Sequence, residues 1–476
     1  MKLYNSLSKQ VEDFSPIDNN LVRVYSCGPT VYDHAHIGNL SAFVSADIVR
    51  RVIAANGYDV KHVMNFTDID DKTIRRSQAE YPDLEPLEAL RTSTGKYTEI
   101  FFDDMRAIGN DIDALTFIKA ADDATIAGMQ EMIAELHQQG FAYIADDGVY
   151  FSIEAYRNSG KVYGQLIEIT ATNTSAARIQ NDEYDKESIH DFALWKTEKP
   201  GEPAWDFTLD GQELRGRPGW HIECSVMSRQ GLGQPFDIHT GGSDLTFPHH
   251  ENEIAQSTAG ADDPTYARYF VHNEHILVDG RKMSKSLGNF YTLRDLAEKG
   301  IDPLAFRLLV LQSHYRKQTN FSLDNVTAAG NRLQSWRTIA TLRHQTHDTL
   351  EDDSDKPAGL HAASQALLEA LSNDFDTPSS LTIIDEAFSK LENTKLEDIH
   401  RRSLVQLLEA IDSLLGLQLL NSTPDISDDA KQLIIARQRA RDEKDWEASD
   451  QARDELLEQG IAVRDTPSGP VWSYSS

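Results

Sequence analysis

The sequence predicts an α/β protein that opens with a parallel β-sheet and continues into helices toward its carboxyl end. Short apolar runs rich in β-formers, at Val22–Ser26 and Val60–Met64, flank a segment with helical periodicity at Ala42–Ala55, which is the pattern of a βαβ unit. Strand and turn signals return at Phe236–Ser243. Beyond Pro303 the pattern is helical almost throughout. Together these three observations favour a parallel sheet followed by a helical region.

Length and pattern changes predict more than one domain. The chain has 476 residues, whereas a single hydrophobic core stops growing at roughly 250 to 300 residues. From about Ile118 the pattern changes to a helix at Ala124–Gln139, a strand-like run at Gly148–Ile153 and a polar stretch at Thr170–Glu187. We interpret these residues as an insertion into the sheet domain.

The carboxyl-terminal part is predicted to be a helical bundle followed by a small module. No repeat of fixed period is visible, which disfavours a solenoid. A polar link at Asn421–Asp429 precedes a predicted final helix at Ala430–Gln459 and a short β-like tail. The helices expected before that link are Leu304–Ser313, Ser322–Arg343, Gly359–Leu371, Pro378–Leu391 and Ile399–Leu415.

Composition argues against a membrane protein and against nucleic-acid binding over the whole surface. No run approaches the roughly 20 apolar residues that cross a bilayer, and the amino-terminal residues lack the regions of a signal peptide. We therefore expect a soluble, cytoplasmic protein with no membrane partner. The formal charge of -30 disfavours phosphate binding in general, although a local basic surface is compatible with it.

A helix start with candidate phosphate-binding residues follows the first predicted strand. The segment DHAHIGN, residues 33–39, lies where free backbone N–H groups and the positive end of a helix dipole favour an anion. Gly38 lets a ligand approach the backbone closely, and His36 and Asn39 can donate hydrogen bonds to phosphate oxygens. On its own, the segment is more typical of ordinary helix capping or of surface residues.

A short basic loop is the second candidate. Lys282, Ser284 and Lys285 lie within the pentapeptide KMSKS, which has glycines on both sides. Two ammonium groups three residues apart, with a hydroxyl between them, suit a mobile clamp on a triphosphate whose charge grows during displacement. By itself this loop is compatible with a solvated turn, but its combination with DHAHIGN is specific.

The two segments together resemble the signature pair of class I aminoacyl-tRNA synthetases. Further segments narrow the resemblance to the cysteinyl-tRNA synthetase family, and it runs from residue 2 to the carboxyl end, most densely up to about residue 320. The chain departs from the family pattern at Asn39, where a histidine is best known, and at Thr240, where a third glycine is more usual. The matching segments are CGPTVYDHAHIGN, NFTDIDDK, RPGWHIECS, FPHHENEIAQS and KMSKSLGNF.

The resemblance implies a Rossmann-like parallel-sheet catalytic domain with a connective insertion, a helical bundle and a small anticodon-binding module. We expect the catalytic domain at 1–117 and 216–275, the insertion at 118–215, the KMSKS loop and a stem-contact region at 276–320, the bundle at 321–420 and the module at 421–476.

A candidate metal site includes both cysteines of the chain. Cys27 and Cys224 are too few for a disulfide framework. His249 and Glu253 are spaced i, i+4, so both face one side of a predicted helix. Two thiolates, an imidazole and a carboxylate suit Zn2+. His250 is a rival ligand, and the resemblance favours His249. The alternative to a metal site is that the two cysteines are buried thiols and that the segment with His249 and Glu253 is an ordinary charged helix start.

Zinc would also explain how the substrate is selected. Serine differs from cysteine only by oxygen in place of sulfur, and a size-based pocket separates such pairs by roughly 1 to 3 kcal/mol. A substrate thiol can ionise and bind zinc, whereas a serine hydroxyl stays protonated. We therefore expect selection at one Zn2+ per chain, without an editing domain.

The resemblance also implies roles for residues around the metal. Gly28, Thr67 and Trp220 are expected to line the amino-acid pocket, with Trp220 excluding larger side chains, and Asp244 is expected to meet the substrate ammonium. Core packing is the structural alternative for Trp220.

ATP is expected as a substrate together with Mg2+. The resemblance assigns ATP binding to Gly38, Ser284 and Lys285. The rate is expected to come from positioning and from stabilising charge on the reacting phosphate, without a protein nucleophile. The expected catalytic residues are His36, Asn39, Lys282 and Lys285.

A basic segment of the final module is a candidate RNA contact. It contains Arg437, Arg439, Arg441 and Lys444, followed by Trp446, which suits phosphate binding and base stacking. Acidic residues between them make a salt-bridged solvated helix an alternative, and only the resemblance favours RNA.

The resemblance implies an enzyme that activates L-cysteine with ATP to cysteinyl-adenylate and transfers it to the 3′ end of the cognate tRNA. We expect it to act as a monomer. One alternative is a related ligase that joins cysteine to an amino sugar, and the module after Ser427 argues against it. Another is an inactive zinc-containing RNA-binding protein, and the intact KMSKS segment argues against that.

Overall fold

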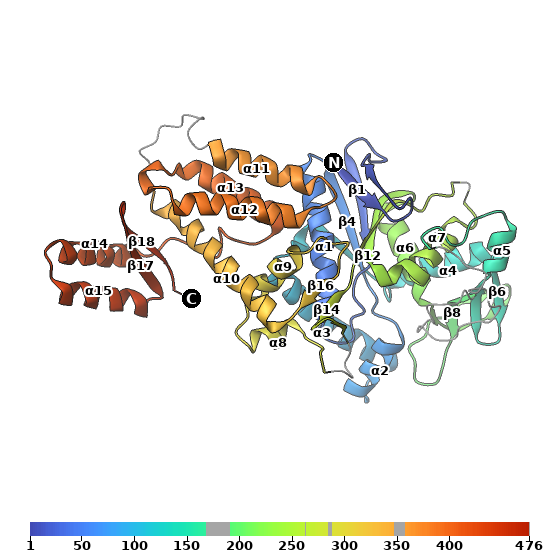
Figure 1. The fold of residues 1–476 in the computed structure, drawn as a ribbon. Helices are drawn as coiled ribbons and strands as arrows, with labels where there is room; N and C mark the ends of the chain where they lie inside the picture. Colours follow the sequence, from blue (N-terminus) through green and yellow to red (C-terminus); the bar gives the residue numbers. More distant parts are fainter. Residues whose placement is uncertain (168–190, 262, 284–287, 347–357, 476) are drawn as a thin grey trace. The chain divides into compact units, whose positions relative to one another are not determined.

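The computed structural model describes residues 1–167, 191–261, 263–283, 288–346 and 358–475, in which the chain forms two compact units (Figure 1). The first unit contains Met1–Asp295 and Tyr315–Thr319, and the second contains Leu296–His314 and Asn320–Ser476. The five finer domain boundaries expected from the sequence stay a prediction. No helix among these described residues combines the length and apolar character that a membrane crossing requires.

A parallel sheet organises the first unit and confirms the predicted α/β class. Its strand order is β13-β12-β3-β4-β5, and each pairing is parallel. The order reverses between β3 and β12, and ligands of such sheets bind beyond the carboxyl ends of the strands at that point. The strands are β3 (Leu21–Ser26), β4 (Asp59–Phe66), β5 (Leu115–Lys119), β12 (Phe236–Gly242) and β13 (Ala267–Asn273).

Helix α1 (Ile37–Ala55) joins β3 to β4 and completes the predicted βαβ unit. It begins earlier than the hydrophobic periodicity indicates, because His36 caps it. Nδ1 of His36 accepts a hydrogen bond from the backbone N–H of Asn39, and Oδ1 of Asn39 accepts one from the backbone N–H of His36. This reciprocal capping fixes the start of the helix. Its buried side includes Leu40 and Val44, which pack toward the sheet.

Two helices between β4 and β5 are not anticipated by the hydrophobic pattern. They are α2 (Asp71–Glu80) and α3 (Pro86–Ala107). Helix α2 is strongly polar and buries only a few side chains. Its start is set by Asp70, whose Oδ1 accepts hydrogen bonds from the backbone N–H groups of Lys72 and Thr73 at 2.9 and 2.7 Å.

The insertion forms its own antiparallel sheet, with strand order β11-β8-β7-β6. Its core includes Ile133, Phe151 and Trp195, all fully buried. The predicted polar stretch at residues 170–187 lies outside the described residues. The elements are α4 (Asp123–Gln138), β6 (Ala142–Ala145), β7 (Gly148–Phe151), α5 (Ile153–Asn158), β8 (Phe192–Thr197), β9 (Thr208–Leu209), β10 (Gln212–Glu213) and β11 (Gly216–Pro218).

The chain returns to the parallel sheet through helix α6 (Trp220–Leu232). After β12 it forms a short 3-10 turn at Ser243–Leu245 and a π-helical turn at Thr246–His250, which continues as α7 (Glu251–Thr258). Every residue of α7 is buried. Hairpins add β1 (Lys2–Asn5) with β2 (Gln10–Asp13), and β14 (Ile276–Val278) with β15 (Arg281–Lys282).

The second unit is mainly helical, as predicted. The chain passes between the units through α8 (Leu293–Ala297) and β16 (Thr319–Phe321). Within the unit, Arg307 is fully buried and its Nε donates to the backbone oxygen of Leu415 at 2.5 Å. The helices before the final module are α9 (Pro303–Leu311), α10 (Leu323–Ala340), α11 (Ala358–Leu371), α12 (Thr377–Glu392) and α13 (Arg401–Leu415).

The prediction of a single final helix at residues 430–459 is wrong. The module instead contains α14 (Asp428–Asp442) and α15 (Trp446–Glu458), followed by the hairpin β17 (Ile461–Thr466) and β18 (Gly469–Tyr474). Lys444 adopts a left-handed backbone with φ of 62°, which ends α14. The break lets both helices contribute to one small core, which includes Ile434, Leu456 and Trp472.

Candidate metal centre and active site

Both cysteines, His249 and Glu253 come together beyond the carboxyl end of β3. Cys27 directly follows that strand, Cys224 lies in α6, His249 in the π-helical turn and Glu253 in α7. Their candidate ligand atoms all lie within 4.8 Å of one another. The two sulfur atoms are 3.9 Å apart, and Nε2 of His249 lies 3.1 Å from Oε1 of Glu253. The structure thus brings together the four side chains that the sequence predicts as metal ligands.

Two further histidines form an alternative donor set with Cys27 and Glu253. His239, in β12, and His250 bring their ring nitrogens within the same 4.8 Å limit. Nε2 of His250 is 3.4 Å from the sulfur of Cys27, and Nε2 of His239 is 2.9 Å from Oε2 of Glu253. His250 is the rival that the sequence suggests. His239 carries no spacing signal, and only its place near the end of a predicted strand hints at it.

Burial sets the charge of this cluster. It lowers the pKa of His249 to about 3 and that of His250 well below its usual value, so both imidazoles keep a lone pair for a ligand. Burial and the neighbouring thiol raise the pKa of Cys27. Burial opposes ionisation of Glu253 too, yet the two histidines beside it lower its pKa overall. A divalent cation would offset the charge of two thiolates and a carboxylate at this place, so the donor set fits a metal ion.

Neighbouring side chains hold the proposed ligands in place. The indole of Trp220 stacks on the imidazole of His249 with ring centroids 4.2 Å apart. Nδ1 of the same imidazole lies 2.9 Å from Nδ1 of His221. The hydroxyl of Tyr266 donates to Oε2 of Glu253 at 2.8 Å. Such outer contacts orient the groups that bind a metal.

His250 is fixed through its second ring nitrogen. Nδ1 of His250 lies 2.8 Å from Nε2 of His272, and Nδ1 of His272 lies 2.8 Å from the hydroxyl of Ser6. Burial lowers the pKa of His272 to about 3. His250 therefore keeps Nε2 directed toward Cys27. The contact between His272 and His250 depends on the tertiary structure, because it requires strand β13 to lie beside β12.

The residues expected to line the amino-acid pocket lie around the same centre. The backbone N–H of Gly28 donates to Oδ1 of Asn65 at 2.7 Å, and a Cβ at Gly28 would lie 1.7 Å from the backbone oxygen of Asn65. Nδ2 of Asn65 donates to the hydroxyl of Thr67 at 3.2 Å. Asp244 follows β12 and is near enough to Cys27 to contribute, after larger effects, to its raised pKa. Trp220 completes the set through its stack on His249.

The two signature segments lie beside each other. The backbone N–H of Ile37 donates to the oxygen of Tyr291 at 2.9 Å, and a Cβ on Gly38 would lie 2.9 Å from Cε of Met283. The start of α1, with its capping pair His36 and Asn39, thus adjoins the edges of the basic loop. Lys282 ends β15 and is exposed. The other predicted members of the clamp, Ser284 and Lys285, lie outside the described residues.

The basic segment of the final module is divided between structural and exposed residues. Arg437 is 4% exposed, and its guanidinium donates to both carboxylate oxygens of Asp465 at 2.7 and 2.9 Å. Arg441 lies 3.2 Å from the same carboxylate and 5.7 Å from the ring centroid of Trp446. Trp446 is 57% exposed, and Arg439 is exposed as well. Arg437 therefore serves the fold of the module rather than an RNA surface.

Comparison with known proteins extends these observations to the whole chain. Residues 13–331 match the family described as the tRNA synthetases class I (C) catalytic domain, and residues 423–472 match the cysteinyl-tRNA ligase anticodon binding domain. A protein of Leptospira interrogans named cysteine--tRNA ligase is 41% identical over 488 residues, covering 99% of both chains. Another protein of that name, from Brachyspira hyodysenteriae, is 39% identical over 481 residues, covering 98% of both chains.

Solved structures with the same fold are more distant in sequence. The methionyl-tRNA synthetase of Mycobacterium tuberculosis, in complex with methionyl-adenylate, is matched over 84% of this chain and 93% of that chain, with a TM-score of 0.59 at 13% identity. The LeuRS of Agrobacterium radiobacter K84 is matched over 87% and 86%, with a TM-score of 0.60 at 11% identity. These two show the fold, whereas the family models and full-length relatives show the family. The chain belongs to the cysteinyl-tRNA synthetase family of the class I aminoacyl-tRNA synthetases.

Proposed function

We propose that this chain activates L-cysteine with ATP, forming cysteinyl-adenylate and pyrophosphate, and then transfers cysteine to the 3′ end of the cognate tRNA. The observation that carries the proposal is the cluster of two thiols, an imidazole and a carboxylate within 4.8 Å, of which only Cys27 is half-buried and the rest are buried. The chain's relatives are named cysteine--tRNA ligase over their full length.

Zinc is the metal that this donor set fits best. Cys27, Cys224, His249 and Glu253 would hold it, because zinc combines readily with thiolate, imidazole and carboxylate ligands. When bound there, zinc supplies a soft Lewis acid that binds a thiolate in preference to a hydroxyl. The chain's own residues would do the rest of the selection. The ring of Trp220 limits the size of the side chain, and the absence of a Cβ at Gly28 keeps the backbone close to Asn65.

The residues of the signature segments would bind ATP and its Mg2+. The start of α1 offers backbone N–H groups and the positive end of a helix dipole, and Gly38 leaves room beside them. His36 and Asn39 would approach the phosphates, and Lys282 would approach from the adjoining hairpin. The roles assigned to Ser284 and Lys285 rest on the sequence pattern.

Positioning supplies the rate, and no protein nucleophile is needed. In the first step a carboxylate oxygen of cysteine bonds to the α-phosphorus of ATP, and pyrophosphate leaves with the electron pair. In the second step a ribose hydroxyl of the terminal nucleotide bonds to the activated carbonyl carbon, AMP leaves, and the hydroxyl proton is released. Holding both reactants in place and stabilising the charge on the leaving phosphate account for such catalysis.

Ligation of cysteine to an amino sugar is not favoured by any feature of the described residues. The module from α14 to β18 has its own core and matches an anticodon-binding domain, which a ligase acting on a small sugar does not need. We expect the protein to be a monomer. Sedimentation or light scattering would measure its oligomeric state.

The test is cysteine-dependent exchange of labelled pyrophosphate into ATP, followed by charging of a transcript of the cysteine tRNA. Serine in place of cysteine is the matched control for the amino acid, and a free amino sugar is the control acceptor. We expect exchange with cysteine but not serine, and charging of the tRNA alone. Absence of exchange would refute the proposal, as would exchange followed by transfer only to the sugar.

A further inference from the structure

Three buried polar side chains form a hydrogen-bonded row across the parallel sheet, close to the carboxyl ends of its strands. Oγ of Ser26, in β3, lies 2.7 Å from Nε2 of His62, in β4, and 2.6 Å from Oγ1 of Thr240, in β12. Each of the three residues is at most 5% exposed. A hydroxyl carries one hydrogen, so that of Ser26 donates to one neighbour and accepts from the other. Two hydrogen bonds thus join three adjacent strands.

The row lies on the face of the sheet opposite the candidate metal centre. Successive side chains of a strand point to opposite faces, so Thr240 points away from His239, whose ring belongs to the alternative donor set. Burial and the nearby Arg50 of α1 lower the pKa of His62 to about 3, which keeps its ring neutral. Among the described residues, Nδ1 of His62 has no hydrogen-bond partner. The contact with Ser26 is therefore what fixes this ring.

The strands that the row joins carry residues expected around the substrate. Cys27 directly follows Ser26, Thr67 directly follows β4, and Asp244 lies two residues beyond β12. Ser26 and Thr240 are the last paired residues of β3 and β12. Just beyond that pair, the backbone N–H of Cys27 donates to the backbone oxygen of Thr240 at 3.2 Å. The row thus fastens the strands at the point from which the site residues emerge.

The substrate requires a fixed separation between two of these groups. Two carbon atoms separate the sulfur of cysteine from its nitrogen, so a thiol at the metal centre and an ammonium at Asp244 must both be met at once. Thr240 stands where a glycine is usual in the family, and a glycine could not supply the hydroxyl that Ser26 contacts. Filling of space is the simpler role for Thr240, and a valine would fill the same space without the hydroxyl.

We propose that Thr240 is a positioning residue, whose hydroxyl holds the end of β12 to Ser26 at the end of β3 and so fixes Asp244 relative to Cys27. His62 extends the same restraint to β4. These side chains act through the residues that follow them on each strand, so they position the site rather than take part in the chemistry. The inference rests on the proposed function for the identity of the substrate.

The first experiment measures zinc binding by the metal-free full chain in competition with a coloured chelator. Thr240→Val should bind zinc about tenfold more weakly, since neighbours of metal ligands typically contribute about 10- to 100-fold. Thr240→Ser keeps the hydroxyl and should bind zinc as the unmodified chain does. Thr98→Val is the matched control, because it deletes a buried hydroxyl of α3 that donates to the backbone oxygen of Thr94 at 2.8 Å. It should leave zinc affinity unchanged.

The second experiment follows cysteine-dependent pyrophosphate exchange at saturating zinc. Thr240→Val should raise the KM for cysteine about tenfold, while the rate at saturating cysteine and the KM for ATP stay unchanged. Ser26→Ala breaks the row at its middle and should give the same result, so it tests the inference even if the valine variant fails to fold. The two changes combined should cost no more than Ser26→Ala alone, because both remove the same contact.

Unchanged zinc affinity in Thr240→Val would overturn the inference, as would an equal loss in Thr98→Val or in Thr240→Ser. Equal rises in the KM for cysteine and for ATP would also overturn it, because they would indicate a general distortion of the sheet. If the unmodified chain showed no exchange, the proposed function would fail, while the zinc measurements would still decide whether the row positions Cys27.

Discussion

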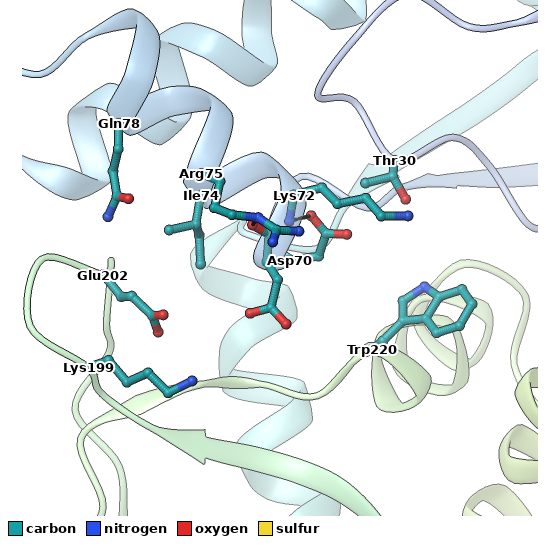
Figure 2. Close-up of a pocket in the computed structure, with 10 residues that line it drawn as sticks. Thr30, Asp70, Lys72, Ile74, Arg75, Gln78, Lys199, Glu202 and Trp220 are labelled. Carbon is teal, nitrogen blue, oxygen red and sulfur yellow. Dashed lines mark hydrogen bonds between the residues drawn. The ribbon is translucent and has the colours of Figure 1, made fainter. Parts of the chain in front are cut away.

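The indole of Trp220 lies nearly parallel to the imidazole of His249, with an interplanar angle of 19° and ring centroids 4.2 Å apart. One side chain thereby touches the candidate metal centre and borders a neighbouring cavity of about 350 Å³ (Figure 2). A flat ring at this position fixes the plane of His249 and shapes the space that the substrate enters.

Trp220→Ala should raise the KM for cysteine about tenfold, because His249 loses the ring that orients it and neighbours of a metal ligand typically contribute 10- to 100-fold. Pyrophosphate exchange at varied cysteine concentrations measures this. Trp220→Phe keeps a flat ring, so its KM for cysteine should lie between that of the unmodified chain and that of the alanine variant. An unchanged KM in the alanine variant would mean that the stack has no role in binding.

Cys224→Ser should lose bound zinc and cysteine selectivity together. With a ligand removed, discrimination should fall to about 100-fold or less, which is what a pocket achieves by size alone. Elemental analysis of the purified chain gives the metal content, and exchange with cysteine and serine gives the selectivity. The control is the unmodified chain treated with a chelator. It should lose zinc and cysteine selectivity together, as the variant does. Full selectivity without metal would contradict the role assigned to zinc.

Gly28→Ala should destabilise the first unit by about 1 to 3 kcal/mol, because the added Cβ would lie 1.7 Å from a backbone oxygen and the strands must move apart. Urea unfolding followed by circular dichroism measures it. Gly95→Ala, in the interior of α3 with open space around it, is the matched control and should stabilise by about 0.5 to 1 kcal/mol. Equal effects at the two positions would refute the packing argument.

His62→Gln should reduce the acid sensitivity of the first unit. Burial, and then the nearby Arg50, lowers the pKa of His62 in the folded chain to about 3, against about 6.5 in an unfolded chain. The unfolded state therefore binds more protons between these values, and stability is lost as the pH falls below about 6.5. At about pH 5 this one histidine lowers the free energy of unfolding by about 2 kcal/mol.

Urea unfolding at about pH 7.5 and at about pH 5 tests this prediction. The loss of stability between the two conditions should be smaller in the variant. His361→Gln, at an exposed histidine of α11, is the control and should leave the loss as it is. The same loss in both variants would mean that His62 does not titrate on unfolding.

Arg437→Gln should destabilise the final module by about 1 to 3 kcal/mol, because it leaves Asp465 without its two-pronged partner. Arg439→Gln, at the exposed neighbour on the same helix, should leave stability unchanged and weaken tRNA binding. Thermal unfolding and tRNA titration of both variants distinguish the two roles. A stable Arg437 variant with weakened RNA binding would reverse the assignment.

The sequence by itself determined the features that depend on near neighbours along the chain. The strand from Leu21 and the helix that ends at Ala55 follow from local hydrophobic patterns, although the helix begins earlier than those patterns indicate. The i, i+4 spacing of His249 and Glu253 predicted that the two side chains meet, and they do, with His249 in the π-helical turn and Glu253 in α7. The resemblance carried by short motifs likewise pointed to the family that the comparisons show.

Only the tertiary structure decided which distant groups meet. His239 reaches the metal centre because β12 lies beside β3, and His272 reaches His250 because β13 lies beside β12; no local pattern encodes that strand order. Beside the cavity that Trp220 borders, a buried arginine, Arg217 of β11, pairs with Asp71 of α2, a residue far from it in the sequence. Arg437 does not belong to the expected RNA surface, because its guanidinium binds Asp465 in the hairpin of β17 and β18. Local propensity acts over a few residues, whereas burial and ion pairing act between segments that only the complete fold brings together.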